Sequence, residues 1–175
     1  LVTPHGGTLV NRIADPERAK ALRDRAKDLP SITLSAKQTC DLEMIAIGAF
    51  SPLIGFCKHA DFASICNDMR LAPPEGAKPR NKPGTWRESK FGAGRPGVDV
   101  GYLWPIPITL AVNEDTVKNL IRRGQAALYH ADGTLMAIMD TSDIYAHDKT
   151  LMNKSVFGTE DPAHPGVKAV LDEGE

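Results

Sequence analysis

Residues 41–56 read DLEMIAIGAFSPLIGF, an apolar stretch that changes from one kind of local structure to another. Its first half has a helical pattern, and Gly48 predicts the end of that helix, because glycine readily adopts the left-handed conformation that follows a helix. The Ser51–Pro52 pair then keeps the helix from resuming. The stretch therefore joins a helix to an irregular apolar segment.

The helix is expected to begin at Ser35, since Ser35 and Gln38 match the capping-box pattern. The helix has a wide apolar face made by Leu42, Met44, Ile45, Ala46 and Ile47. We therefore expect it to be largely buried. Cys40 lies in the same pattern and is predicted to be a buried, inert thiol.

The rest of the chain alternates between helical and extended patterns. Asp15 and Pro16 predict a helix start, and the basic residues on this helix alternate with acidic ones, which favours a solvated face. Strand patterns include a hairpin around Asp132–Gly133 and an edge strand in which two prolines occupy alternate positions. The expected helices are 15–27, 35–48, 60–68, 113–124 and 148–157, and the expected strands are 31–34, 103–112, 125–130 and 134–139. The predicted fold class is α+β, because the strands are too scattered for a doubly wound sheet.

Composition limits the function classes. The chain has 175 residues, enough for one domain, with 42% hydrophobic and 25% charged residues. A net charge of −1 makes nucleic acid an unlikely partner. Three cysteines without a C-x-x-C pair indicate reduced thiols in a cytoplasmic protein. The longest apolar run is too short to cross a bilayer, so no membrane partner is expected.

The motifs that could carry chemistry are weak. Residues 92–97 match G-x-G-x-x-G, but no helix pattern follows them to receive a phosphate. Gly6–Gly7 beside His5 is read as a tight turn, and Asp140 and Asp143 as solvated acids. The histidines do not form a metal-binding pair. We therefore assign no catalytic, cofactor-binding or metal-ligating residue.

Five segments resemble, in order, the N-terminal domain of ATP sulfurylases (sulfate adenylyltransferases). They are LVTPHGG at 1–7, DLEMIAIGAFSPLIGF at 41–56, LWPIPITL at 103–110, DIY at 143–145 and VFGTEDPAHPGV at 156–167. The resemblance implies one PUA-like domain over 1–175, a mixed, partly closed pseudo-barrel with peripheral helices. It also implies a parent enzyme that converts ATP and sulfate to adenosine 5′-phosphosulfate and pyrophosphate, using Mg²⁺.

The sequence departs from the family pattern in two places. The family's nucleotide-binding signature, which belongs to the next domain, is absent, so the resemblance implies that this chain binds no cofactor and is inactive alone. Its expected partner is the missing catalytic domain, and we expect apolar surface around the C-terminal tail; a homo-oligomer is a further expectation. The Pro/Gly-rich, basic segment at about 72–101 is an insertion, either an arm that contacts a partner or a passive loop.

Two other interpretations remain open. PUA-like folds also occur in RNA-associated proteins, and the basic helix and basic insertion suit an RNA-binding module, although fold analogy is a weak argument for function. The second is a self-sufficient small enzyme, for which no assembled site is visible.

Overall fold

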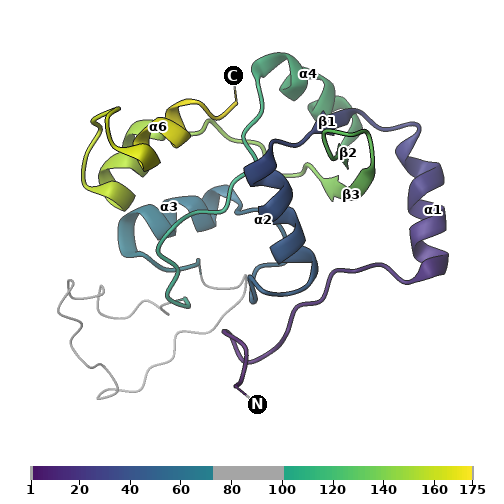
Figure 1. The fold of residues 1–175 in the computed structure, drawn as a ribbon, viewed down its shortest axis with the longest axis horizontal. Helices are drawn as coiled ribbons and strands as arrows, with labels where there is room; N and C mark the ends of the chain where they lie inside the picture. Colours follow the sequence, from purple (N-terminus) through teal and green to yellow (C-terminus); the bar gives the residue numbers. More distant parts are fainter. Residues whose placement is uncertain (1, 73–100, 175) are drawn as a thin grey trace.

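A computed structural model of the chain describes residues 2–72 and 101–174 (Figure 1). Within these ranges, helices surround a small sheet. The elements in order are α1 (Pro16–Ala26), β1 (Ser31–Thr33), α2 (Ala36–Ala46), α3 (His59–Asp68), α4 (Glu114–Arg123), β2 (Gln125–Tyr129), β3 (Leu135–Asp140), α5 (Lys149–Met152), the π-helix η1 (Asn153–Phe157) and α6 (Pro165–Leu171).

The sheet is mixed, with the strand order β1-β2-β3. β1 runs parallel to β2, with Ile32 opposite Leu128, and β2 forms an antiparallel hairpin with β3. The parallel pair is extended by the Leu34 N–H, which donates to the Tyr129 carbonyl at 2.8 Å. The described strands form an open sheet, so the expected closure into a pseudo-barrel is not confirmed by them.

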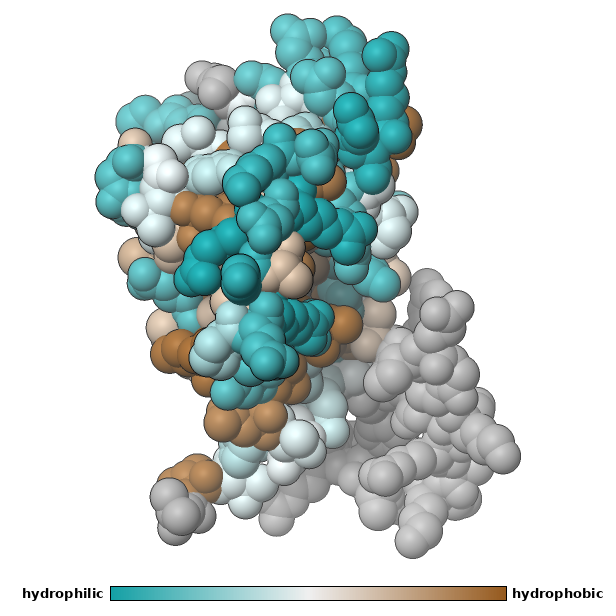
Figure 2. Space-filling view, turned by 90° about the vertical axis from the view of Figure 1, so that its right-hand side faces the viewer, coloured by the Kyte–Doolittle hydropathy of each residue, from teal (hydrophilic) through white to brown (hydrophobic). Residues whose placement is uncertain are grey.

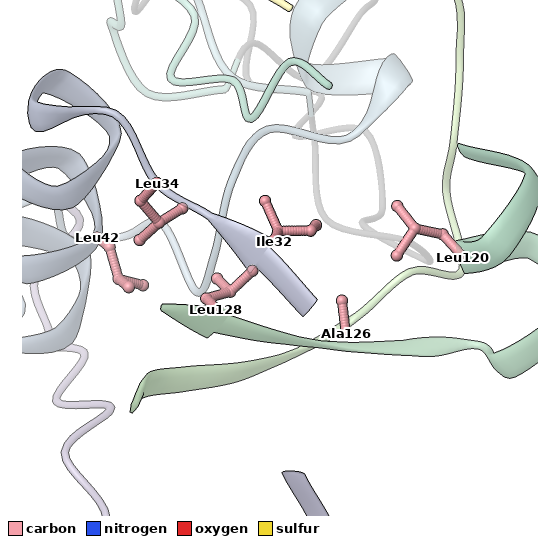
Figure 3. Close-up of a cluster of buried hydrophobic side chains, with 6 residues drawn as sticks. All are labelled: Ile32, Leu34, Leu42, Leu120, Ala126 and Leu128. Atoms are coloured by element: carbon pink, nitrogen blue, oxygen red, sulfur yellow. The ribbon is translucent and has the colours of Figure 1, made fainter. Parts of the chain in front are cut away.

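The main core lies between this sheet, α2 and α4. In Figure 3, Leu120 of α4 points toward Ile32 and Ala126, while Leu42 of α2 lies beside Leu34. All six side chains of the cluster are buried: Ile32, Leu34, Leu42, Leu120, Ala126 and Leu128. Burial of this apolar area, on the face of β1 that carries Ile32, therefore holds the sheet to the helices.

Two smaller apolar clusters support α3 on either side. One joins Ile65 to Leu53, Cys57 and Leu71, and the other joins Phe62 and Cys66 to Met152 of α5 and Val170 of α6. α3 therefore links the segment after α2 to the C-terminal helices.

Most helix boundaries follow the predicted caps. The Asp15 side chain accepts from the Arg18 N–H, and the capping box of Ser35 and Gln38 is present in both directions. Gly124 ends α4 and Gly158 ends η1, both in the left-handed conformation. The predicted helices and the predicted hairpin are confirmed to within one or two residues, with the C-terminal one divided between α5 and η1.

The predicted edge strand at 103–112 is wrong. Leu103 makes an isolated bridge with Arg70, and the residues after it form no ladder. Pro105 and Pro107 have no N–H to donate, so the segment is held by single contacts, such as the Cys57 N–H donating to the Ile108 carbonyl at 2.8 Å. The segment therefore contacts its neighbours at separate points and does not pair as a strand.

The predicted burial of α2 is also wrong on one side. Thr39, Leu42 and Ile45 are buried, but Met44 and Ile47 are exposed. Cys40, predicted to be buried, is exposed as well. The sequence has apolar residues on two sides of this helix, whereas the domain covers only one of these sides.

α1 stands at the edge of the domain (Figure 1). It turns Ala19, Leu22 and Ala26 inward, and only Ala26 is fully buried. Figure 2, which looks onto this side, shows a hydrophilic surface over the middle of the face and hydrophobic patches toward its lower end. The outer side chains of α1 are exposed to solvent, as the alternating charges predicted.

The insertion predicted at about 72–101 and the G-x-G-x-x-G match at 92–97 lie outside the described residues, apart from residues 72 and 101. In the part of the chain that is described, no helix is long and apolar enough to cross a membrane.

Replacing Leu128 by Ala is expected to lower the free energy of unfolding by about 2–5 kcal/mol, because Leu128 is 1% exposed at the centre of the main core. Urea unfolding followed by circular dichroism measures this change. The control is Ile121→Ala, since Ile121 is 67% exposed and its loss should change stability by less than about 0.5 kcal/mol. Equal effects of the two substitutions would contradict this core.

Candidate functional site

The described residues hold no cluster of histidine, cysteine, aspartate and glutamate side chains that could bind a metal ion. His5, His59, His130, His147 and His164 are distributed over five different segments. His164, for example, caps α6, because its Nδ1 accepts from the N–H groups of Gly166 and Val167.

The glycine pair near the N-terminus forms a tight turn, as predicted. The Gly7 N–H donates to the Pro4 carbonyl at 2.8 Å, and both glycines have positive φ angles. His5 Nε2 lies 3.0 Å from the Leu103 carbonyl, and its ring contacts the ring of Tyr102 edge-on. The turn thus fastens the N-terminal arm to the segment around Leu103.

A group of titratable side chains lies at the N-terminal end of α3. The Tyr145 hydroxyl donates to the Cys57 carbonyl at 2.9 Å, and its ring lies 5.1 Å from the His59 ring. Asp143 Oδ2 accepts from the His59 N–H at 2.9 Å, so Asp143, predicted to be a solvated acid, also caps α3 from another segment. These contacts fasten residues 143–147 to α3.

The Cys57 thiol of this group is not a nucleophile at neutral pH. Burial raises its pKa to about 12, and its sulfur accepts from the Ile108 N–H at 3.4 Å. Burial also raises the pKa of Cys66 to about 11. Both thiols therefore stay protonated, and their contribution is to packing.

A shallow groove of about 480 Å³ lies between the C-terminal end of α1 and the turn of the hairpin. Ser31, Thr33 and Tyr129 form part of its lining. Its two basic side chains already have partners: Lys27 pairs with Asp24, and His130 Nδ1 lies 2.9 Å from Asp132 Oδ1. Because both basic side chains are paired with carboxylates of this chain, the groove has, among the described residues that line it, no unpaired basic side chain for an anionic ligand.

The last residues of the chain are fastened to the first turn of α2. Lys37 Nζ lies 2.9 Å from Glu173 Oε1 and 3.4 Å from Asp41 Oδ2, and Lys149 Nζ donates to the Leu171 carbonyl at 2.6 Å. Burial opposes the charge on Lys37, but the hydrogen bond to Glu173 and the two carboxylate charges outweigh it and raise its pKa. No local sequence signal could reveal this contact, since Lys37 and Glu173 are 136 residues apart.

The exposed face of α2 is the strongest candidate for an interaction surface. Cys40, Met44 and Ile47 recur at the i, i+4, i+7 spacing that places side chains on one helical face, and we call them the α2 stripe. Met44 is 38% exposed and Ile47 53%. In residues 145–174 no large apolar side chain is exposed, so any apolar surface beside the C-terminal tail comes from other segments.

Comparison with known proteins identifies the family to which this chain belongs. The model of a PUA-like domain family matches residues 2–175, so this chain belongs to that family. Among the curated proteins it is homologous to the N-terminal part of sulfate adenylyltransferase.

The relatives are longer than this chain. It is 37% identical to a sulfate adenylyltransferase of Symbiobacterium thermophilum and 36% identical to one of a Synechococcus strain, covering 99% of this chain and 37% of each relative. It is also 36% identical to a probable bifunctional SAT/APS kinase of Sorangium cellulosum, over 99% of this chain and 25% of that one. A solved structure described as a hexameric APS kinase from Thiobacillus denitrificans is 34% identical with a TM-score of 0.59, over 85% of this chain and 24% of that one.

Folding stability is expected to fall as the pH is lowered through about 6.5, and His147 contributes to this fall. Burial, together with the charges of Lys149 and Lys37, holds the pKa of His147 below its usual 6.5, against the opposing charges of Glu173 and Asp148. The unfolded chain therefore binds the proton more readily than the folded one. Urea midpoints measured between pH 5 and 8 should show a smaller decline for His147→Gln, and an unchanged decline would contradict this role.

In the native chain, maleimide is expected to modify Cys40 and to spare Cys57 and Cys66. Cys40 is exposed, whereas the other two are 6% and 7% exposed and have raised pKa values. Mass spectrometry of the cysteine-containing peptides measures each rate, and the urea-unfolded chain, in which all three should react, is the control. Fast modification of Cys57 in the native chain would show that its cluster is open.

Proposed function

We propose that this chain is the N-terminal scaffold domain of a sulfate adenylyltransferase and is inactive by itself. The observation that carries the proposal is the match of nearly the whole chain to about 37% of the length of several sulfate adenylyltransferases. The other 63% or so of those proteins has no counterpart in these residues.

In the proposed parent enzyme, a sulfate oxygen attacks the α-phosphorus of ATP, and pyrophosphate leaves. Such a reaction needs groups that position two anions and offset their repulsion, with Mg²⁺ and basic side chains as the usual means. We assign these groups to the missing catalytic domain, and no residue of this chain to catalysis or to ATP.

The contacts within this chain suit a supporting role. Its titratable groups hold segments together: the Tyr145 hydroxyl and the Asp143 carboxylate both attach the segment before α5 to the start of α3. The C-terminal end is fixed to α2 through Lys37 and Glu173, which would give a following domain a defined starting point. The cytoplasm is the proposed location of such an enzyme, and a homo-oligomer is its proposed assembly.

The test is molybdate-dependent ATP cleavage with Mg²⁺, in which molybdate replaces sulfate and the unstable product hydrolyses. Residues 1–175 are expected to show no turnover, and a polypeptide continued through the downstream region of the gene is expected to be active. Turnover by residues 1–175 alone would contradict the scaffold role and indicate a complete site in this chain.

RNA binding remains the alternative function. A salt-dependent shift of labelled RNA by residues 1–175 would support it, and no shift at low salt would exclude it.

A further inference from the structure

The α2 helix is apolar on two opposite sides. Its inner side buries Thr39, Leu42 and Ile45, and its outer side carries the α2 stripe of Cys40, Met44 and Ile47. The charged side chains of Lys37, Asp41 and Glu43 belong to the same helix. Single exposed apolar side chains are common, but three in register along one helix form a surface suited to a partner.

The N-terminal arm extends this surface. The Arg12 N–H donates to the Ala46 carbonyl at 2.9 Å, and the Val10 N–H donates to Ser51 Oγ at 2.9 Å, so the arm runs along the C-terminal end of α2. Leu9 and Ile13 are the chain neighbours of these two contact residues, and their side chains are 58% and 63% exposed.

Gly48 makes this close approach possible. A Cβ atom at this position would lie 2.8 Å from the Val10 carbonyl oxygen and 2.9 Å from a methyl carbon of Leu9, and Gly48 has a φ of 81°. Leu9 therefore packs directly beyond the end of the helix. Leu9 thus adds an exposed apolar side chain just beyond the end of the helix that carries the α2 stripe.

The last described residues of the chain lie beside the first turn of α2, the helix that carries the α2 stripe. Glu173 is paired with Lys37, which lies three residues, or about 5 Å along the helix axis, before Cys40. Ile47 lies only about 15 Å from Lys37 along the same axis. A polypeptide that continues past residue 175, as the longer relatives do, would thus start at one end of the α2 stripe.

We propose that the α2 stripe, with Leu9 and Ile13, is the docking surface for the region that follows residue 175. This inference rests on the proposed function, because it takes the parent to be as long as its relatives. The docking partner presents an apolar face of its own, and the charges of Lys37, Asp41 and Glu43 form a polar rim. Attachment at Glu173 keeps the partner at a high effective concentration, so even a modest apolar surface suffices.

Cys40 provides a built-in reporter for this docking. Its modification by maleimide is measured in residues 1–175 and in the polypeptide continued through the downstream region, by mass spectrometry of the peptide that contains Cys40. Docking is expected to slow the modification by at least about tenfold, since the thiol then reacts only when the interface opens. Equal rates in the two polypeptides would overturn the proposal.

Substitutions in the α2 stripe test whether slow modification of Cys40 in the longer polypeptide is caused by docking at this surface. Ile47→Glu and Met44→Glu, placed in the continued polypeptide, are expected to restore most of the fast rate, because a charge must then be buried at the interface. Ile121→Glu is the matched control, since Ile121 is exposed on α4, and it should leave Cys40 protected. Circular dichroism of each variant of residues 1–175 checks that the domain still folds. Continued protection in the Ile47→Glu and Met44→Glu variants would overturn the proposal.

The readouts distinguish this inference from the proposed function. An active continued polypeptide with an unprotected Cys40 would retain the sulfurylase assignment and exclude this docking surface. A protected Cys40 in a polypeptide without molybdate-dependent activity would retain the docking surface and exclude the assignment. Sedimentation of residues 1–175 tests whether a second copy of the chain binds to this surface instead. A dimer, together with protection of Cys40 that rises with protein concentration, would assign the surface to a second copy and overturn the proposal.

Discussion

The pairing of β1 with β2 is the contact on which the rest of the domain depends. Ile32 and Leu128 lie opposite each other in adjacent parallel strands, although about a hundred residues separate them in the sequence. Closing so long a loop costs conformational entropy, and the burial of the six-residue core around this pair offsets that cost. Once β1 is fixed, α2 follows within a few residues and α4 leads directly into β2, so both helices are placed by this one strand pair.

Local sequence signals predicted the elements well, because each depends on neighbouring residues. The Ser35–Gln38 box and the Asn113–Gly124 pair mark helix ends whose hydrogen bonds span only a few positions. The five segments that resemble sulfurylases correctly indicated the PUA-like family and the homology of this chain to sulfate adenylyltransferase. Periodicity could show that α2 is apolar, but it could not show which of its apolar residues this domain covers.

The contacts that fasten distant segments of the domain join residues that no local pattern connects. Lys37 meets Glu173, which is 136 residues away, and Asp143 caps α3 from a segment 84 residues away. Cys40 was misplaced for a related reason: its apolar neighbours were evidence of burial, but that burial is not provided within the described domain. For the segment after Leu103, the alternating pattern predicted a strand, but the segment forms only an isolated bridge with Arg70.

α1 packs sparsely against the rest of the domain, so it can detach locally while the rest stays folded. Two alanines and one leucine are all that this helix turns inward, so little apolar area is exposed when it detaches, while the six-residue core keeps the sheet intact. Its Asp15 cap and its charge pairs act within the helix and do not hold it to the sheet. α1 therefore detaches at a low cost in free energy, and its lysine- and arginine-rich sequence then offers trypsin several cleavage sites.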